Sequence, residues 1–256
     1  MFRSKQLLAA TAVLALGTAS AQGATLMHHW TFDTNGLDAV GAAHATLESG
    51  TAIVAGGQFG NALSVPDAAA GAVVGASDAP VLPTTNFTFT AWVNQDVNNT
   101  ESFGTIMGNQ SGGSAAGAFL RADTEGSDGD LFGRVNNGPG ATAEAGTIDA
   151  GQWTHVAMTV SSTAGLTIYV NGTAVGTNAS GTSHVLSTGS FDIGTRPGTG
   201  TQDFHGLIDD VAIFNGVLTQ GELNTVIASG AAAVPEPGSL ALLGLGGLLV
   251  ARRQRG

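Results

Sequence analysis

Hydrophobic and polar residues alternate along most of the chain with the period of two that is typical of β-strands. In residues 87–93, large apolar side chains alternate with small or polar ones, as expected for a strand with one buried face. The longest runs of this kind are residues 87–93, 153–160, 166–170 and 207–214. Glycine and asparagine clusters separate the runs at intervals of roughly 8–15 residues, which favours a β-sandwich.

Two local signals add a hairpin and a helix to this pattern. Asn171-Gly172 stands between two β-prone runs, where this dipeptide is a strong signal for a two-residue hairpin turn. Thr219 and Glu222 have the spacing of a capping box, with Thr219 at the N-cap of a short helix. The residues expected on its apolar face are Leu223, Val226 and Ile227.

The N-terminal residues have the pattern of a secretory signal peptide. Arg3 and Lys5 precede the apolar stretch 7–16, and Ala19-Ser20-Ala21 forms an A-x-A cleavage site. We therefore expect residues 1–21 to be removed, with cleavage between Ala21 and Gln22, and the protein to be exported.

The C-terminal residues form a second processing signal. Pro235, Glu236 and Pro237 precede an uncharged stretch, residues 238–250, and Arg252 and Arg253 follow it. A helix needs about 20 apolar residues to cross a bilayer, so this stretch predicts a short, transient membrane segment.

Proline–glutamate–proline, an apolar helix and an arginine cluster, in that order, resemble the PEP-CTERM sorting signal of exopolysaccharide-producing Gram-negative bacteria. The resemblance covers residues 234–256. It implies recognition and processing by exosortase, and a final location at the cell envelope, the cell surface or the extracellular matrix.

Charge and cysteine content limit what the remaining residues can do. Residues 22–233 contain no cysteine and no lysine, and they carry three arginines against 18 acidic residues, a net charge near −15. A surface of this charge repels nucleic acids and anionic membranes, and it suits hard cations with oxygen ligands. Without disulfides, the fold must be stabilised by its packing alone or by its packing together with a bound metal.

Six short motifs follow one another through this region. They are residues 29–33, 57–63, 87–93, 151–157, 168–172 and 206–211. In this order they resemble the laminin G-like, concanavalin A-like jelly-roll domain of secreted bacterial proteins. The resemblance implies an all-β fold, a two-sheet antiparallel sandwich with one short C-terminal helix, over residues 22–228. Residues 229–233 are then expected to be a linker to the sorting signal.

No catalytic or cofactor-binding residues are expected. A glycoside hydrolase needs two carboxylates about 5–10 Å apart across a cleft, and no predicted strand has the near-alternate acids of laminarinase-type enzymes on this fold. The Gly-x-Ser-x-Gly motif does not occur. The acidic segment 123–130 is rich in glycine and serine and is interpreted as a hairpin loop.

One structural calcium ion is the metal that the resemblance implies. Related jelly rolls often hold Ca²⁺ between the first strand and the last. The matching positions are Asp33 or Asp38, the backbone at Gly60 and Asn61, and Asp209 or Asp210. A charged carboxylate buried in a strand is costly unless it is paired, so one of the last two is expected to bind the metal or a partner.

Three functions remain open. The first is a binding module for a carbohydrate or a surface protein, acting in adhesion or biofilm structure. The second is a glycoside hydrolase or polysaccharide lyase on the same fold, and the third is a purely structural matrix subunit. Exposed aromatic residues in a groove favour the first, paired carboxylates favour the second, and the absence of both favours the third.

Overall fold

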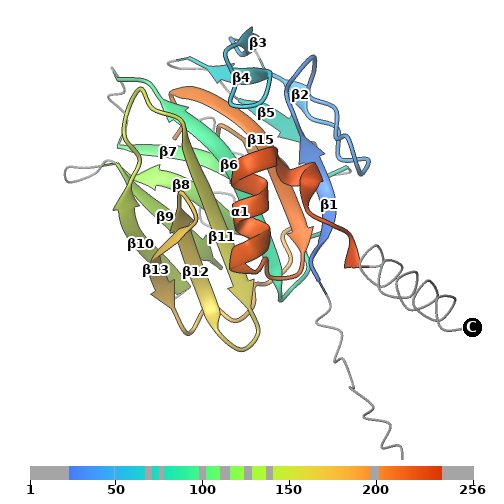
Figure 1. The fold of residues 1–256 in the computed structure, drawn as a ribbon, viewed down its shortest axis with the longest axis vertical. Coiled ribbons are helices and arrows are strands. Elements are labelled where there is room, and N and C mark those ends of the chain that lie inside the picture. The colour runs from blue at the N-terminus through green and yellow to red at the C-terminus, as the bar shows by residue number, and fades with distance from the viewer. Residues whose placement is uncertain are drawn as a thin grey trace, which may run out of the picture.

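The chain forms two antiparallel β-sheets stacked face to face, with one α-helix on the outer face of the larger sheet (Figure 1). The computed structural model describes residues 23–48, 50–66, 71–74, 78–97, 102–109, 116–123, 129–136, 141–196 and 202–237. The predicted signal peptide and residues 238–256 lie outside these residues. The predicted all-β jelly-roll sandwich with a short C-terminal helix is confirmed.

The larger sheet has eight strands in the order β13-β12-β11-β6-β15-β4-β3, with β1 also paired to β15. The longest strand, β15, pairs with β6 along one edge and with β4 and then β1 along the other. The bounds are β1 Thr25–Trp30, β3 Ala52–Ala55, β4 Asn61–Val65, β6 Phe87–Gln95, β11 Thr154–Ser161, β12 Gly165–Val170, β13 Thr173–Asn178 and β15 Gly206–Asn215.

The smaller sheet has seven strands in the order β10-β9-β8-β7-β14-β5-β2. Four consecutive strands, β7 to β10, form a meander at one side, and β14 connects them to β5 and β2. The bounds are β2 Thr46–Leu47, β5 Ala72–Val74, β7 Phe103–Gly108, β8 Ala118–Asp123, β9 Asp130–Val135, β10 Ala141–Thr147 and β14 Phe191–Ile193.

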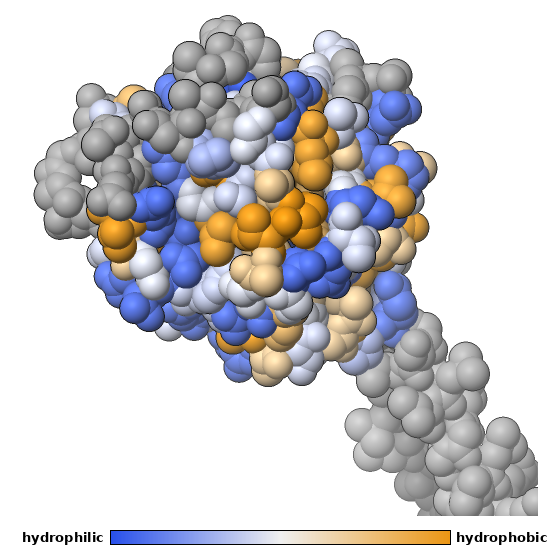
Figure 2. Space-filling view, turned by 90° about the horizontal axis from the view of Figure 1, so that it is seen from above, coloured by the Kyte–Doolittle hydropathy of each residue, from blue (hydrophilic) through white to orange (hydrophobic). Residues whose placement is uncertain are grey.

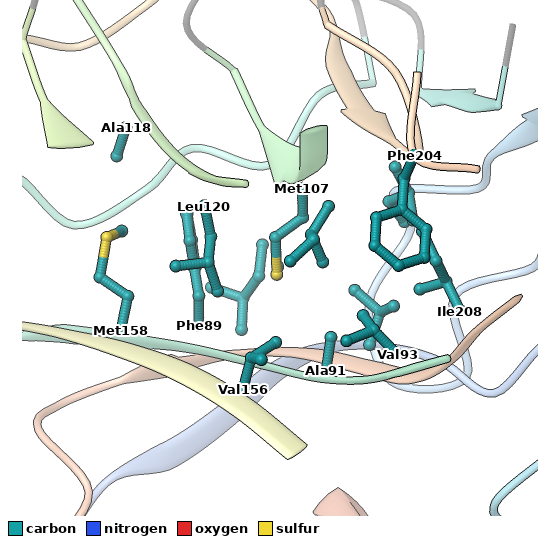
Figure 3. Packing of buried hydrophobic residues seen from close by; sticks show 14 of the residues in the cluster. Phe89, Ala91, Val93, Met107, Ala118, Leu120, Val156, Met158, Phe204 and Ile208 are labelled. Atoms are coloured by element: carbon teal, nitrogen blue, oxygen red, sulfur yellow. The ribbon is translucent and has the colours of Figure 1, made fainter. Parts of the chain in front are cut away.

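The main hydrophobic core lies between the two sheets and follows the period-two pattern of the sequence. On β6, Phe89, Ala91 and Val93 point into this core, where they meet Met107 and Leu120 of the smaller sheet (Figure 3). The alternate β6 residues face the other way, toward the helix. Each Å² of apolar surface buried here stabilises the folded state by about 25 cal/mol. This burial is the main stabilising contribution in a fold without disulfides.

The predicted hairpin turn is confirmed. Asn171 and Gly172 both have positive φ angles, 48° and 78°, and they connect β12 to β13. These angles are those of the type I′ turn, whose twist matches that of the flanking strands.

Helix α1 (Gln220–Ser229) covers the outer face of the larger sheet over β6 and β15 (Figure 1). Leu223 and Val226 are buried in a second apolar cluster that includes Phe214 of β15. The following 3₁₀ helix η1 (Ala231–Ala233) continues along the sheet, and Ala231 and Val234 belong to the same cluster. The structure therefore places the segment expected as a linker, residues 229–233, against the sheet.

Buried polar groups accompany this second cluster. His155 of β11 is fully buried, and its ring meets that of Trp92 edge to face at 5.4 Å. Among the described residues, neither ring nitrogen of His155 has a hydrogen-bond partner. Burial lowers the pKa of His155 to about 4, although the charge of Asp210 opposes this shift, so the imidazole is neutral at physiological pH.

In the view of Figure 2, hydrophobic residues form small patches surrounded by hydrophilic ones. Within the described part of the chain, no helix is both long and apolar enough to span a membrane. The predicted membrane segment, residues 238–250, lies outside that part.

The cap of α1 gives a first prediction. The Glu222 backbone N–H donates to Thr219 Oγ1 at 3.3 Å, and the Thr219 N–H donates to Glu222 Oε2 at 2.7 Å. Thr219→Ala removes one side of this capping box and is expected to lower the free energy of unfolding by about 1 kcal/mol in urea denaturation. Thr225→Ala, the same change inside the helix, is the control and is expected to shift it by less than about 0.5 kcal/mol. Equal losses in the two variants would contradict a capping role.

Candidate functional site

Four of the predicted metal-site positions, Asp33, Gly60, Asn61 and Asp209, converge at the turn between β3 and β4. The Asn61 backbone N–H donates to Asp33 Oδ1 at 3.1 Å, and Asn61 Nδ2 donates to the Asp33 carbonyl at 2.7 Å. From the opposite side, the Phe59 N–H donates to Asp209 Oδ2 at 2.8 Å. The turn therefore lies between the loop after β1 and the strand β15, and it brings Asp33 and Asp209 to one place.

Glycine permits this close approach. Gly60 has a φ of +83°, and a Cβ added there would overlap Asp33 Oδ1. A Cβ at Gly57 would overlap the Asn61 carbonyl oxygen and lie 2.8 Å from Asp209 Oδ2. Glycine at both positions therefore lets the backbone of this turn lie against the two carboxylates.

The electrostatics of this place favour a cation. Asp209 is fully buried, and burial raises its pKa to about 6 despite hydrogen bonds from the N–H groups of Phe59 and Asp210. The negative charges of Asp210 and Asp33 raise it further. These carboxylates line a cleft of about 190 Å³ at the edge of the larger sheet. A positive ion there would offset the repulsion between them.

The donor set is one that calcium accepts, because Ca²⁺ binds carboxylate and main-chain carbonyl oxygens in variable geometry. Among the described residues, no group of three or more histidine and acidic side chains gathers as a metal site. A bound ion would therefore be held by Asp33 and Asp209 together with main-chain oxygen such as that of Asn61.

Asp38 lies apart from this place and has a different role. Its buried carboxylate accepts hydrogen bonds from His28 Nδ1 at 2.7 Å and from four backbone N–H groups. Burial opposes ionisation, but these bonds outweigh it and hold the pKa of Asp38 well below its usual range. The backbone donors are His29, Val40, Gly41 and Ala43. Asp38 thus fixes the loop that follows β1.

Asp210 also has partners of its own. A bulge in β15 gives it a φ of 48°, and its carboxylate accepts from the Ala231 N–H at 2.9 Å. His29 Nε2 lies 2.6 Å from Asp210 Oδ1, and both side chains are buried. Asp210 therefore joins β1, β15 and η1.

A second polar region lies on the outer face of the smaller sheet, and sequence reasoning did not find it. Core residues alternate on β8 and β9 with side chains that point away from the core. We call this surface the Arg–Phe face, and its residues are Phe103, Phe119, Arg121, Phe132, Arg134 and Arg196. The signal in the sequence is Phe-x-Arg-x-Asp at 119–123 followed by Asp-x-Phe-x-Arg at 130–134.

Strand register sets the order of charges on this face. Across the β8–β9 pair, Phe119 stands opposite Arg134, and Asp123 stands opposite Asp130. Arg196 extends over the Phe119 ring at 5.8 Å. One end is thus basic, with Phe119, Arg134 and Arg196. The other end is acidic, with Asp123 and Asp130, and Glu144 of β10 stands opposite Phe132, level with Arg121.

Arg121 lies between the two ends and is held by its neighbours. Its guanidinium is 4.2 Å from the ring centroids of Phe103 and Phe132, and Arg121 Nη2 donates to Asp123 Oδ2 at 2.7 Å. Cation–π contacts and an ion pair therefore fix its orientation.

At the acidic end, burial raises the pKa of Glu144, the charges of Asp123 and Asp130 raise it further, and Arg121 opposes them.

Comparisons with known proteins agree with this fold. The profile of the concanavalin A-like lectin/glucanases superfamily matches residues 67–224, and that of the PEP-CTERM protein-sorting motif matches residues 233–255. The chain therefore belongs to the concanavalin A-like lectin/glucanase superfamily and carries a PEP-CTERM sorting signal. This signal indicates an exported, cell-surface protein processed by exosortase-type machinery.

Solved structures show the same architecture. Domain 4 of AbnA, a GH43 extracellular arabinanase from Geobacillus stearothermophilus in complex with arabinotriose, is 21% identical with a TM-score of 0.60, over 83% of this chain and 100% of that chain. A Trypanosoma rangeli sialidase is 18% identical with a TM-score of 0.58, over 80% of this chain but 32% of that chain.

The receptor-binding domain of a botulinum neurotoxin C/D mosaic serotype is 15% identical, with a TM-score of 0.59, over 79% of this chain and 51% of that chain. Identities this low show a shared fold alone. The search of curated proteins gives no match.

The described part of the sorting motif lies at the surface. Pro235 and Glu236 are exposed, whereas a Cβ added at Gly23 would lie 3.3 Å from the Pro237 ring. Gly23, the second residue after the predicted signal cleavage site between Ala21 and Gln22, therefore lies beside the sorting motif. Ala21, Gln22, Arg252 and Arg253 are outside the described residues.

The role of Asp38 can be tested through pH. Asp38→Asn is expected to lower the free energy of unfolding at pH 7 by about 2–4 kcal/mol, because buried backbone donors lose a charged acceptor. The pKa of Asp38 is lowered in the folded state, so its contribution is complete above the unfolded pKa of about 4 and is lost as pH falls further.

Urea denaturation between pH 2 and pH 7 measures both effects. The variant should show a shallower loss of stability than the parent below about pH 4. The exposed Asp149 supplies the control. Asp149→Asn should change neither the free energy of unfolding at pH 7 nor its loss at low pH by more than about 0.5 kcal/mol. Parallel pH curves for the parent and Asp38→Asn would rule out this account of Asp38.

Proposed function

We propose that the protein is a non-catalytic binding module at the envelope of a Gram-negative bacterium, where it contacts extracellular polysaccharide or a surface partner in adhesion or biofilm structure. The Arg–Phe face carries this proposal. It combines ordered guanidinium groups, carboxylates and aromatic rings on one sheet face, whereas α1 covers the outer face of the other sheet.

A purely structural subunit is the alternative. The aromatic rings do not provide a flat platform for a sugar, because Phe119 and Phe132 are 3% and 7% exposed. Recognition on this face would therefore depend on the polar groups that cover the rings.

The first test is binding of the exported chain, residues 22–256, to polysaccharide from the producing strain, with the release of reducing ends followed in parallel. We expect binding without release. Failure to bind any fraction, with the fold intact by circular dichroism, would refute the binding proposal and favour the structural subunit.

A second candidate function, glycoside hydrolysis, is favoured by the acidic end. Asp123 and Asp130 stand directly opposite on an antiparallel pair, and burial raises the pKa of the neighbouring Glu144, with the charges of Asp123 and Asp130 adding to the rise. A retaining glycosidase needs carboxyl groups about 5–5.5 Å apart, one of them with a raised pKa. Reducing-end release that is abolished by both Asp123→Asn and Glu144→Gln would establish hydrolysis and overturn the non-catalytic assignment.

We further propose that one calcium ion binds between Asp33 and Asp209 and stabilises the edge of the sandwich. The close glycine backbone, the buried Asp209 and the repulsion between the carboxylates support this. Such an ion would join the loop after β1, the β3–β4 turn and β15, so its role would be structural.

Calcium binding predicts a change in melting temperature. Adding Ca²⁺ to chelator-treated protein at about 100 times its dissociation constant should add about 2.7 kcal/mol of stability, which raises Tm by roughly 5–10 °C. Asp33→Asn and Asp209→Asn should each remove this rise, and the matched control Asp149→Asn should keep it. An unchanged Tm in the parent, or an undiminished rise in both site variants, would exclude this site.

A further inference from the structure

Helix α1 leaves one end of the outer face of the larger sheet open. The residues beneath α1 and η1 include Ala157, Ala212 and Phe214, which belong to the second apolar cluster. At the end of the sheet where β6 stops, there is a pocket of about 340 Å³, and no residue of α1 or η1 lines it. The ends of β4, β6 and β15 form this pocket, together with Val97 and Gly151 of two neighbouring loops. Its volume is within the range of about 300–1,000 Å³ that is usual for ligand pockets.

Strand register brings three side chains of the pocket into one row. Leu207 of β15 stands opposite Ser64 of β4 on one side and opposite Asn94 of β6 on the other. Residues next to them in the sequence belong to the core between the sheets, so these three side chains point outward. Neighbouring strands are about 4.8 Å apart, and the row therefore spans about 10 Å. It presents a hydroxyl group, an aliphatic group and an amide in sequence.

Trp153 adds an aromatic side chain beside this row. Thr154, the first residue of β11, stands opposite Val93 of β6. Trp153 precedes Thr154, so it is level with Asn94 and on the outer face of the sheet. Side chains directly opposite on neighbouring strands have Cβ atoms about 4.5–5.5 Å apart. The Trp153 side chain therefore stands next to the Asn94 amide, at one end of the row.

Trp153 is also the tryptophan that a ligand can reach. Trp30 and Trp92 are 0% and 6% exposed, whereas Trp153 is half-buried. Its Nε1 donates to the Gly56 carbonyl of the β3–β4 turn at 3.3 Å, and this hydrogen bond orients the indole ring. A ring that is already oriented loses little entropy when a ligand packs against it.

The polar groups of the pocket suit a ligand that is rich in hydroxyl groups and has no charge. Within the described part of the chain, no hydrogen bond engages the side chain of Asn94 or of Ser64. An amide and a hydroxyl group each both donate and accept hydrogen bonds, as the hydroxyl groups of a sugar do. Among the lining residues, Asp96 is the one with a charged side chain, and no arginine or lysine is present. An anionic ligand would find no cation here and would be repelled by the acidic domain.

We propose that this pocket binds a neutral polysaccharide, whose sugar rings pack against Trp153 and Leu207 and whose hydroxyl groups bond to Asn94 and Ser64. A sugar ring has apolar C–H faces and a polar edge, so it needs an apolar surface beside a few polar groups. The row and the tryptophan supply both. This inference rests on the proposed binding function, and it adds a site on the opposite sheet from the Arg–Phe face and the class of ligand that this site takes.

The experiment separates polysaccharide of the producing strain by charge. Anion exchange divides it into a neutral and an acidic fraction, and calorimetry measures binding of each to the exported chain, residues 22–256, before and after protease treatment of the fraction. The neutral fraction should bind equally well in both states. It should also protect the tryptophan fluorescence from quenching by acrylamide, because Trp30 and Trp92 are already buried and Trp153 is the ring that the sugar covers.

Variants then locate the site. Trp153→Ala should weaken binding of the neutral fraction at least about tenfold, and Trp153→Phe, which keeps a ring, should retain most of the affinity. Asn94→Ala removes one hydrogen-bonding group and should weaken binding about fivefold. Asn215→Ala is the matched control, because it makes the same change at an exposed position at the end of β15, and it should bind like the parent. Circular dichroism establishes that each variant is folded.

The outcomes separate this inference from the proposed function. Binding of the acidic fraction alone, or full affinity for the neutral fraction in both Trp153→Ala and Asn94→Ala, overturns the inference and leaves a binding function intact. Equal losses in Asn94→Ala and Asn215→Ala overturn it too, because the effect is then not specific to the pocket. Binding that protease treatment abolishes identifies a protein partner and overturns the assignment of a glycan. If neither fraction binds in either state, the proposed function fails together with the inference.

Discussion

Two adjacent carboxylates, Asp209 and Asp210, are buried in the middle of the longest strand. Several distant segments of the chain supply their hydrogen-bond donors. A buried charge without partners is costly, so each side chain must find donors or a cation. The bulge in β15 sends them to different neighbours. Asp209 receives the Phe59 N–H from the β3–β4 turn, and Asp210 receives the Ala231 N–H and the His29 ring.

This arrangement connects distant parts of the chain. Through Asp210, the first strand and the segment after α1 are fastened to the same strand, so the sorting motif leaves the domain next to Gly23. The same fastening keeps η1 over the larger sheet, whose outer face is thereby covered. The outer face of the smaller sheet is not covered by α1, and it carries the Arg–Phe face.

The fold could be predicted from the sequence to a large extent, because the main signals are local. Alternation identifies the strands, and the Asn171-Gly172 and Thr219–Glu222 patterns identify a turn and a cap, all confirmed by the structure. The sequence did not show which of Asp33 and Asp38 lies at the predicted metal site. Both lie in one segment, and only the folded loop shows that Asp38 already has five donors.

The Arg–Phe face was missed for a different physical reason. Residues 119–123 and 130–134 each show the alternation that places their polar side chains on one face. What the sequence does not contain is the strand order that brings Arg196 beside Phe119, or the register that separates the basic end from the acidic end. Strand order and register both follow from pairing between distant segments. The free energy of that pairing depends on the whole sheet.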